Sequence, residues 1–347
     1  MNCRESLRVG LVVGLLAAAA VGCSRSPRPA ADQVVVYTSV DQVFAEPVLI
    51  TFERQSGLDV QAVYDTEETK STGILNRLLA EAEHPRADVF WSGDPIRPQI
   101  LISRGLVEPY APPTAEGIPE AFRGAGGTWT GFSARARVVL LNTELVPDGE
   151  RPGSIRDYLD PRWKDRTAIA NPAYGTTTVH LAALFETWGD EEGRTFLAGL
   201  RDNGVRVASS NGEVKRLVSA GEVAWGLVDT DDAAVAVESG APVAVVFPDD
   251  GDLGTLVIPT AAVRIAASPN PEQGKALVDY LVSAEVERAL AEAACRQMPL
   301  RADVPTPSSV RSVAEIDSMA VDYSTLGDAV ERLQPELLAW AEGTGGP

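Results

Sequence analysis

Three carboxylates, Asp229, Asp231 and Asp232, stand within four residues of one another, directly after an apolar run over 223–228. Side chains just past the carboxyl end of a strand in an open α/β sheet face the crevice where ligands bind. Carboxylates at such a place can accept hydrogen bonds from an amine or from sugar hydroxyls, or hold a hard cation. The alternative is a solvated turn whose aspartates cap the helix expected at 233–238, since Asp is a preferred N-cap residue.

The chain around these aspartates alternates strands and helices, which predicts an α/β fold with a mostly parallel sheet covered on both faces. Strands are predicted at 33–39, 58–64, 87–91, 131–143, 167–170, 205–208, 223–228, 243–247 and 255–267. Helices are predicted at 69–83, 96–104, 176–187, 191–201, 213–220, 233–238, 271–282 and 285–294, with another after the first strand and a last one ending near Ala341. We expect strands 131–143 and 255–267 to pair, so that the chain returns to its first half.

Short hydroxyl, amide and carboxylate side chains dominate the junctions where a strand gives way to a helix, and His and Cys are absent from them. Since these junctions share one edge of their sheet, we expect their side chains to gather there. This composition suits hydrogen-bonded capture of a polar ligand better than nucleophilic or metal chemistry. The candidate ligand-binding residues at the junctions are Ser39, Val40, Asp41, Glu67, Ser92, Gly93, Asp94, Tyr174, Gly175, Thr176, Thr177, Thr178, Asn211, Asp229, Asp231 and Asp232.

Two stretches are typical of anion binding. Gly175 permits close approach of a ligand to the backbone, and the threonines at 176–178 begin a helix whose free N–H groups attract an anion. The alternative there is simple N-capping by Thr176. Arg135 and Arg137 lie on one face of strand 131–143 and could form a bidentate clamp, since guanidinium offers a planar fork of donors. The alternative is surface charge on an edge strand.

The titratable residues argue against an enzyme. The two histidines, His84 and His180, lie at no spacing that pairs them with a nucleophile, and no Cys or His spacing typical of a metal site occurs. The formal net charge is -19, so the chain should repel nucleic acid and anionic membranes. We therefore expect no catalytic residue, no cofactor and no nucleic-acid partner.

The first residues indicate export. Residues 1–22 have a short basic region followed by an apolar run that is too short to span a membrane, as in a signal peptide. The run ends in a sequence that resembles the lipobox of bacterial lipoproteins, which implies cleavage before Cys23 and acylation of its sulfur. Residues 23–32 would be the lipidated tether, and the protein would be anchored by lipid on the periplasmic or cell-surface side. Cys295 is then the single cysteine of the folded part, so no internal disulfide is expected.

Together these features resemble the extracellular solute-binding proteins of ABC importers, in the branch of the ferric-ion-binding and organophosphate- or phosphonate-binding proteins. The blocks that carry the resemblance are VVVYTSVDQVF at 34–44, ADVFWSGD at 87–94, GFSARARVVLLNT at 131–143 and ANPAYGTTT at 170–178. The resemblance implies a two-lobe periplasmic binding protein fold (type II) in which two crossing strands join the lobes. The first lobe would comprise 33–131 plus about 260–300, and the second 132–259 plus about 305–345.

The resemblance also implies a monomer that captures a small polar solute and delivers it to permease and ATPase subunits. Ferric-binding members typically carry two adjacent tyrosines in the matching loop, whereas the loop Asp229-Thr230-Asp231-Asp232 of this chain has no tyrosine. Ferric iron with a synergistic anion stays open as the transported ligand, with Asp231 and Asp232 as its candidate ligands, beside a phosphorylated or phosphonate solute.

Two rival hypotheses belong to other classes. A strand followed by Asp-x-Asp also resembles the haloacid-dehalogenase-type phosphotransferases, in which Asp229 would be the nucleophile and Asp231 the acid/base. The other rival is a lipid-tethered scaffold that binds no small ligand.

Overall fold

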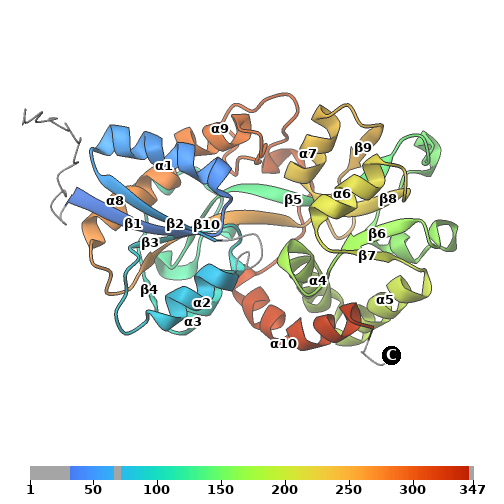
Figure 1. Cartoon of the computed structure of the whole chain (residues 1–347), viewed down its shortest axis with the longest axis horizontal. Helices are drawn as coiled ribbons and strands as arrows, with labels where there is room; N and C mark the ends of the chain where they lie inside the picture. The colour runs from blue at the N-terminus through green and yellow to red at the C-terminus, as the bar shows by residue number, and fades with distance from the viewer. Residues whose placement is uncertain (1–31, 66–71, 344–347) are drawn as a thin grey trace, which may run out of the picture.

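The structure is a computed structural model that describes residues 32–65 and 72–343. The signal peptide, the lipidation site Cys23 and the candidate residue Glu67 therefore lie outside the described residues. Within the described ranges, strands and helices alternate and build a mixed α/β molecule, which confirms the predicted fold class. Figure 1 shows two groups of helices on either side of two long central strands.

The first group begins with strand–helix units that follow one another closely in the chain. Gly57, with φ +76°, ends the first helix in the left-handed conformation that glycine adopts without strain. The elements are β1 (Gln33–Thr38), α1 (Gln42–Ser56), β2 (Asp59–Tyr64), α2 (Thr72–Ala80), β3 (Val89–Ser92), α3 (Ile96–Ser103) and β4 (Val107–Glu108). The pairs β1–β2 and β1–β3 are parallel, as the alternation predicts.

The second group repeats this pattern around a second set of parallel strands. Its elements are β6 (Thr167–Ala170), α4 (Gly175–Trp188), α5 (Asp190–Asp202), β7 (Arg206–Ala208), α6 (Asn211–Ser219), β8 (Trp225–Asp229), α7 (Thr230–Glu238) and β9 (Val243–Val246). Strand β6 pairs in parallel with both β7 and β8. The carboxyl end of β8 is thus the site of the three aspartates.

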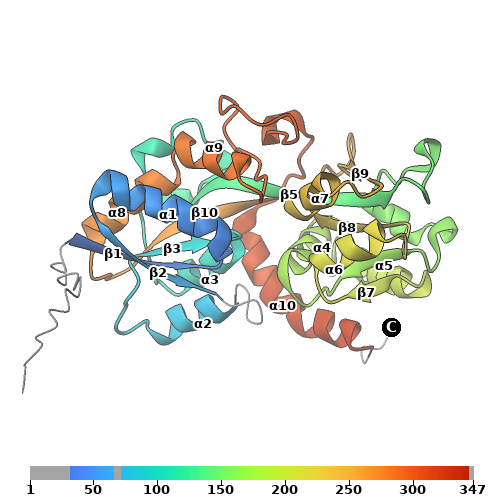
Figure 2. The same cartoon turned by 45° about the horizontal axis from the view of Figure 1, so that its top comes forward.

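Strands β5 (Thr130–Asn142) and β10 (Val257–Ile265) connect the two groups (Figures 1 and 2). They pair antiparallel along the first part of β5, and the second part of β5 pairs with β8 and β9. The strand order is β2-β1-β3-β10-β5-β8-β6-β7, with β4 beside β10 and β9 beside β5. The predicted pairing of 131–143 with 255–267 is confirmed, although β10 is shorter than predicted.

The remaining helices follow β10 or lie in the connections. Helices α8 (Pro271–Leu281) and α9 (Ala284–Glu292) belong to the first group, and α10 (Tyr323–Ala341) packs against both α3 and α4. The lobe boundaries expected from the sequence stay a prediction. Short 3₁₀ helices are η2 (Pro113–Ala115), η3 (Glu120–Phe122), η4 (Ala125–Gly127), η5 (Asp148–Glu150), η6 (Ile155–Leu159), η7 (Pro161–Trp163) and η8 (Val313–Glu315).

The core lies on the central strands, because every residue of β10 is buried and β5 is buried except at one position. A strand covered on both faces is mainly apolar, as β5 is over 138–141 and β10 over most of its length. Over the described ranges, the structure contains no helix with the length and apolar character required to cross a membrane.

Candidate ligand-binding site

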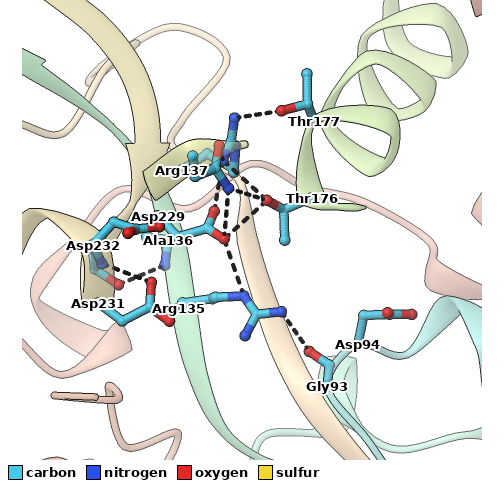
Figure 3. A network of polar contacts seen from close by, with 12 residues as sticks. Gly93, Asp94, Arg135, Ala136, Arg137, Thr176, Thr177, Asp229, Asp231 and Asp232 are labelled. Carbon is cyan, nitrogen blue, oxygen red and sulfur yellow. Dashed lines mark hydrogen bonds and ion pairs between the residues drawn. The ribbon is translucent and has the colours of Figure 1, made fainter. Parts of the chain in front are cut away.

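The strand–helix junctions of both groups meet at β5, where Arg135 and Arg137 project toward the carboxyl end of β8 (Figure 3). The β5–β8 register places Arg137 directly opposite Asp229. Strand β5 lies between β10 and β8, so it is a central strand of the sheet. The alternative that these arginines are surface charges on an edge strand is therefore wrong.

The Asp229 carboxylate is the centre of the polar network. It is 5% exposed, and both of its oxygens have partners. Oδ1 accepts a hydrogen bond from Nη1 of Arg137 at 2.7 Å, and Oδ2 accepts one from Oγ1 of Thr176 at 2.9 Å. Oδ2 also accepts a hydrogen bond from Nδ2 of Asn211 at 3.2 Å. Asp229 holds the N-cap position of α7 without capping it through its side chain, so capping does not account for this residue.

Arg137 is fully buried and is held entirely by protein groups. Besides Asp229, its Nη1 donates to Oγ1 of Thr176 at 3.0 Å and to Oδ1 of Asn211 at 3.1 Å. Its Nη2 donates to Oγ1 of Thr177 at 3.1 Å. In this arrangement Arg137 orients the residues at the starts of α4 and α6 and presents no donor to solvent.

Arg135 joins the two groups of elements. Its Nη2 donates to the carbonyl of Gly93 at 3.0 Å, after β3, while its Nε lies 3.3 Å from Oδ2 of Asp229, after β8. The side chain is 19% exposed, so part of it remains accessible to solvent. Burial lowers the pKa of Arg135, but the surrounding carboxylates, Asp229 first, hold the pKa above its ordinary value. The other carboxylates that act on this guanidinium are Asp231, Asp94 and Asp41.

The first-group candidates form one compact junction. Oγ of Ser39 accepts the N–H of Gly93 at 2.9 Å, which ties the end of β1 to the end of β3. The Val40 N–H donates to Oγ1 of Thr38 at 3.0 Å, and Oγ of Ser92 accepts the Asp94 N–H at 3.4 Å. Asp41 precedes α1, and its carboxylate acts on Arg135 as described above.

Asp94 has a structural role at the start of α3. Its Oδ1 accepts the N–H groups of Ile96 at 2.8 Å and Arg97 at 3.1 Å, and its Oδ2 pairs with the Arg97 guanidinium at 3.0 Å. Such bonds satisfy N–H groups that the first turn of a helix leaves without partners. Asp94 is also buried, so its contact with a ligand stays a prediction.

The start of α4 has its hydroxyl groups turned to protein partners. Gly175 has φ +64°, in the left-handed region that glycine adopts without strain. Thr176 and Thr177 bond the Asp229–Arg137 pair, and Oγ1 of Thr178 donates to the carbonyl of Pro172 at 2.9 Å. Thr176 therefore does not cap the helix with its side chain. Tyr174 is 60% exposed beside this turn and is the most accessible residue of the stretch.

The two other aspartates of the loop differ in their partners. Oδ1 of Asp232 accepts a hydrogen bond from Nζ of Lys215 at 3.0 Å, while Oδ1 of Asp231 accepts the N–H of Asp232 at 2.9 Å. Burial and the charges of Asp229 and Asp232 raise the pKa of Asp231 to about 7, although Arg135 opposes the rise. Among the described residues, no three His, Cys, Asp or Glu side chains gather in a way that could hold a metal ion.

Two contributors were absent from the sequence-based set. Lys215 lies on α6 one helical turn after Asn211, so an i, i+4 reading of that helix could have found it. Thr230 accepts the Ala136 N–H through Oγ1 at 3.2 Å and links the aspartate loop to β5. No sequence signal identifies that contact, because it depends on how β5 and β8 are aligned.

Comparisons with known proteins show the family to which the chain belongs. Residues 85–317 match the family model of the bacterial extracellular solute-binding proteins. Iron uptake protein A1 of Synechocystis sp. is 27% identical over 348 residues, which covers 94% of this chain and 95% of that protein. A putative 2-aminoethylphosphonate-binding periplasmic protein of Salmonella typhimurium is 26% identical over 300 residues, which covers 84% of this chain and 85% of that protein.

Solved structures show the same architecture. Iron-bound HitA from Pseudomonas aeruginosa aligns with a TM-score of 0.77 at 22% identity and covers 90% of this chain and 99% of that one. The molecule thus has the two-lobe type II binding-protein fold that the sequence predicted. The family match covers more than half of the chain, and the protein belongs to the bacterial extracellular solute-binding proteins.

Proposed function

We propose that this protein is the substrate-binding component of an ABC-type importer and captures one small polar solute between its two groups of elements. The observation that carries the proposal is the position of Arg135. This side chain of a connecting strand touches Gly93 of the first group and Asp229 of the second. A solute bound beside it would contact both groups at once and shift the population toward a closed form.

The residues offered to the solute are those that retain exposure around Arg135. Asp231 lies among them and accepts hydrogen bonds from an amine or a hydroxyl when it is ionised. Asp41 and Arg135, which are also partly exposed, complete the contact with the solute. The relatives are named for iron and for aminoethylphosphonate, so the two ligand classes to separate are ferric iron with its anion and an organophosphate or phosphonate.

The burial and the hydrogen bonds of the Asp229 carboxylate support a binding protein over an enzyme. The phosphotransferase alternative needs this carboxylate as a nucleophile, yet both oxygens are engaged by Arg137, Thr176 and Asn211. A nucleophile must reach its substrate, whereas this group is 5% exposed. We expect no phosphatase activity from the purified protein.

Export and a lipid anchor at Cys23 complete the proposal, with a monomer that meets permease and ATPase subunits at the membrane. The family is extracellular, which supports export. Cys23→Ala should release the protein from the membrane fraction while leaving its melting temperature unchanged. Retention of the variant in that fraction argues against the anchor.

A thermal-shift screen of the purified protein tests the capture function. The panel contains ferric citrate, inorganic phosphate, hexose phosphates, 2-aminoethylphosphonate and polyamines. Binding to the native state stabilises it by mass action and so raises the melting temperature. The free energy of unfolding rises by about 2.7 kcal/mol when the ligand is at about 100 times its Kd. A response to ferric citrate but not to citrate assigns iron, and a response to the phosphonate assigns the organic class. No response to any solute contradicts the capture function.

A further inference from the structure

We propose that Asp229 is a built-in counter-anion: its carboxylate fills an oxyanion site formed by Arg135, Arg137, Thr176 and Asn211, so that the solute binds without a free anion at that place. The inference rests on the proposed capture function and specifies how its site is arranged. From the sequence, the expected place for an anion is Thr176 to Thr178 together with Asn211. The structure shows the Asp229 carboxylate bonded to Thr176 and Asn211 (Figure 3).

The donors around Asp229 are of the kinds that bind oxyanions. Two are guanidinium groups from β5, at 2.7 Å for Arg137 and 3.3 Å for Arg135. The others are the hydroxyl of Thr176 in the first turn of α4, at 2.9 Å, and the amide of Asn211 at the first position of α6, at 3.2 Å. Helix N-termini add partial positive charge, which favours an anion between them. Side chains from three separate elements therefore converge on one carboxylate.

The geometry also indicates that the space around Asp229 suits an anion when that carboxylate is removed. Asp229 is the carboxylate that pairs with Arg137, whereas Asp231, Asp94 and Asp41 also act on Arg135. Nε of Arg137 is buried and has no hydrogen-bond partner among the described residues. Without the Asp229 carboxylate, the fully buried Arg137 guanidinium would lose its ion-pair partner, and breaking a buried pair from one side is strongly unfavourable. A free anion would then be drawn into the vacated space.

Formate is the matched probe, because Asp229→Ala removes one carboxylate group and formate restores a group of that shape. We expect formate, compared with chloride at equal ionic strength, to raise the melting temperature of Asp229→Ala by a few degrees along a saturating curve. The wild-type protein should show no such response to formate, since the Asp229 carboxylate already occupies the space.

Two control variants separate a site from a change of net charge. Asp229→Asn removes the charge but fills the space, so formate should not stabilise it. Glu336→Ala removes a carboxylate beside Arg194 at the exposed surface, where the ion pair is 3.0 Å long, and should not respond either. If Asp229→Ala does not fold in chloride, refolding in formate is the second measurement, and recovery of a cooperative melt supports the proposal.

Four results overturn the inference: equal stabilisation of wild type by formate, a response of Asp229→Asn equal to that of Asp229→Ala, a folded Asp229→Ala with no formate response, or no recovery of an unfolded one. These outcomes are independent of the solute screen. A screen without a hit contradicts the capture function even if formate rescues Asp229→Ala, and a missing rescue leaves a positive screen intact.

Discussion

Two buried arginine–carboxylate clusters adjoin β5, and they differ in what they hold. The first pairs Glu287 of α9 with Arg301, at 3.2 Å, and Glu287 also accepts the backbone N–H groups of Ser133 at 3.0 Å and Leu300 at 2.9 Å. Arg301 donates its remaining N–H groups to backbone carbonyls, among them that of Val282 at 2.9 Å. This cluster fixes the course of four stretches of backbone.

The second cluster, around Asp229, holds side chains instead. Its carboxylate is bonded by arginine, threonine and asparagine side chains from separate junctions, and Arg135 stays 19% exposed. Buried polar groups whose bonds are complete make a segment rigid, whereas an accessible or unpartnered donor can serve a ligand. The first cluster thus holds mainly backbone groups, whereas the second is built of side chains and is the candidate binding site, although both contact β5.

The largest stability effect is expected at the first cluster. Glu287→Ala leaves Arg301 without its counter-charge and the backbone N–H groups of Ser133, Leu300 and Arg301 without acceptors. Breaking a buried pair from one side costs about 3–5 kcal/mol. Urea unfolding should show a lower midpoint with an unchanged slope. Glu287→Gln is the control, because its amide oxygen keeps one acceptor and should lose less. A Glu287→Ala protein of normal stability that no longer binds solute contradicts the distinction.

The largest binding effect is expected at the second cluster. Arg135→Ala removes the partly exposed guanidinium together with its contacts to Gly93 and Asp229. Losing a charged hydrogen bond costs about 1.5–3 kcal/mol. The Kd of the solute identified by the screen should rise about 10- to 100-fold by calorimetric titration. Arg206→Ala, whose ion pair with Glu222 is exposed and 3.2 Å long, is the matched control with unchanged Kd. An unchanged Kd in Arg135→Ala removes Arg135 from the site.

Titration of Asp231, beside the second cluster, should make the stability of the protein depend on pH. This effect is expected to be smaller than those of the substitutions above. The native pKa of Asp231 is about 7 against an ordinary 3.8, so the native state binds this proton more readily than the unfolded state does. Stability of the empty protein should therefore fall as pH rises through that window. Asp232, whose pKa burial also raises, adds to the same slope. Groups facing Asp231 are Arg135, Asp229, Asp232 and the Cys295 thiol.

Urea unfolding at several pH values checks this expectation, with Asp231→Asn as the variant. The amide does not titrate, so stability should fall less steeply with pH between the ordinary pKa of 3.8 and the native pKa of about 7. An amine solute should bind more tightly as pH rises through about 7, because the ionised carboxylate accepts its hydrogen bonds. A slope that Asp231→Asn leaves unchanged assigns the pH dependence to other groups.

The sequence predicted the α/β alternation and the pairing of β5 with β10, because long apolar runs can only be buried central strands. It also predicted that the polar strand–helix junctions gather along one edge of their sheet. It could not predict that Arg137 faces Asp229, since that contact depends on strand register, which is set by the whole sheet. The anion expected on Thr176 to Thr178 and Asn211 stays a prediction. Local chemistry could not show that Asp229, which is distant in sequence, bonds Thr176 and Asn211.

Asp94 is a residue whose position after a strand predicted a ligand contact, and its replacement is expected to have the smallest effect on stability and solute binding. Local spacing placed it in the site, while the structure bonds its carboxylate to the first N–H groups of α3. Asp94→Ala should cost about 1 kcal/mol of stability, as loss of a helix-capping carboxylate does. Asp94→Asn keeps an acceptor oxygen and should cost less. Calorimetric titration should give an unchanged Kd for both, because Arg97 and the helix start take up the Asp94 carboxylate. A tenfold weaker Kd in both variants would instead make Asp94 part of the solute contact and extend the binding site into the start of α3.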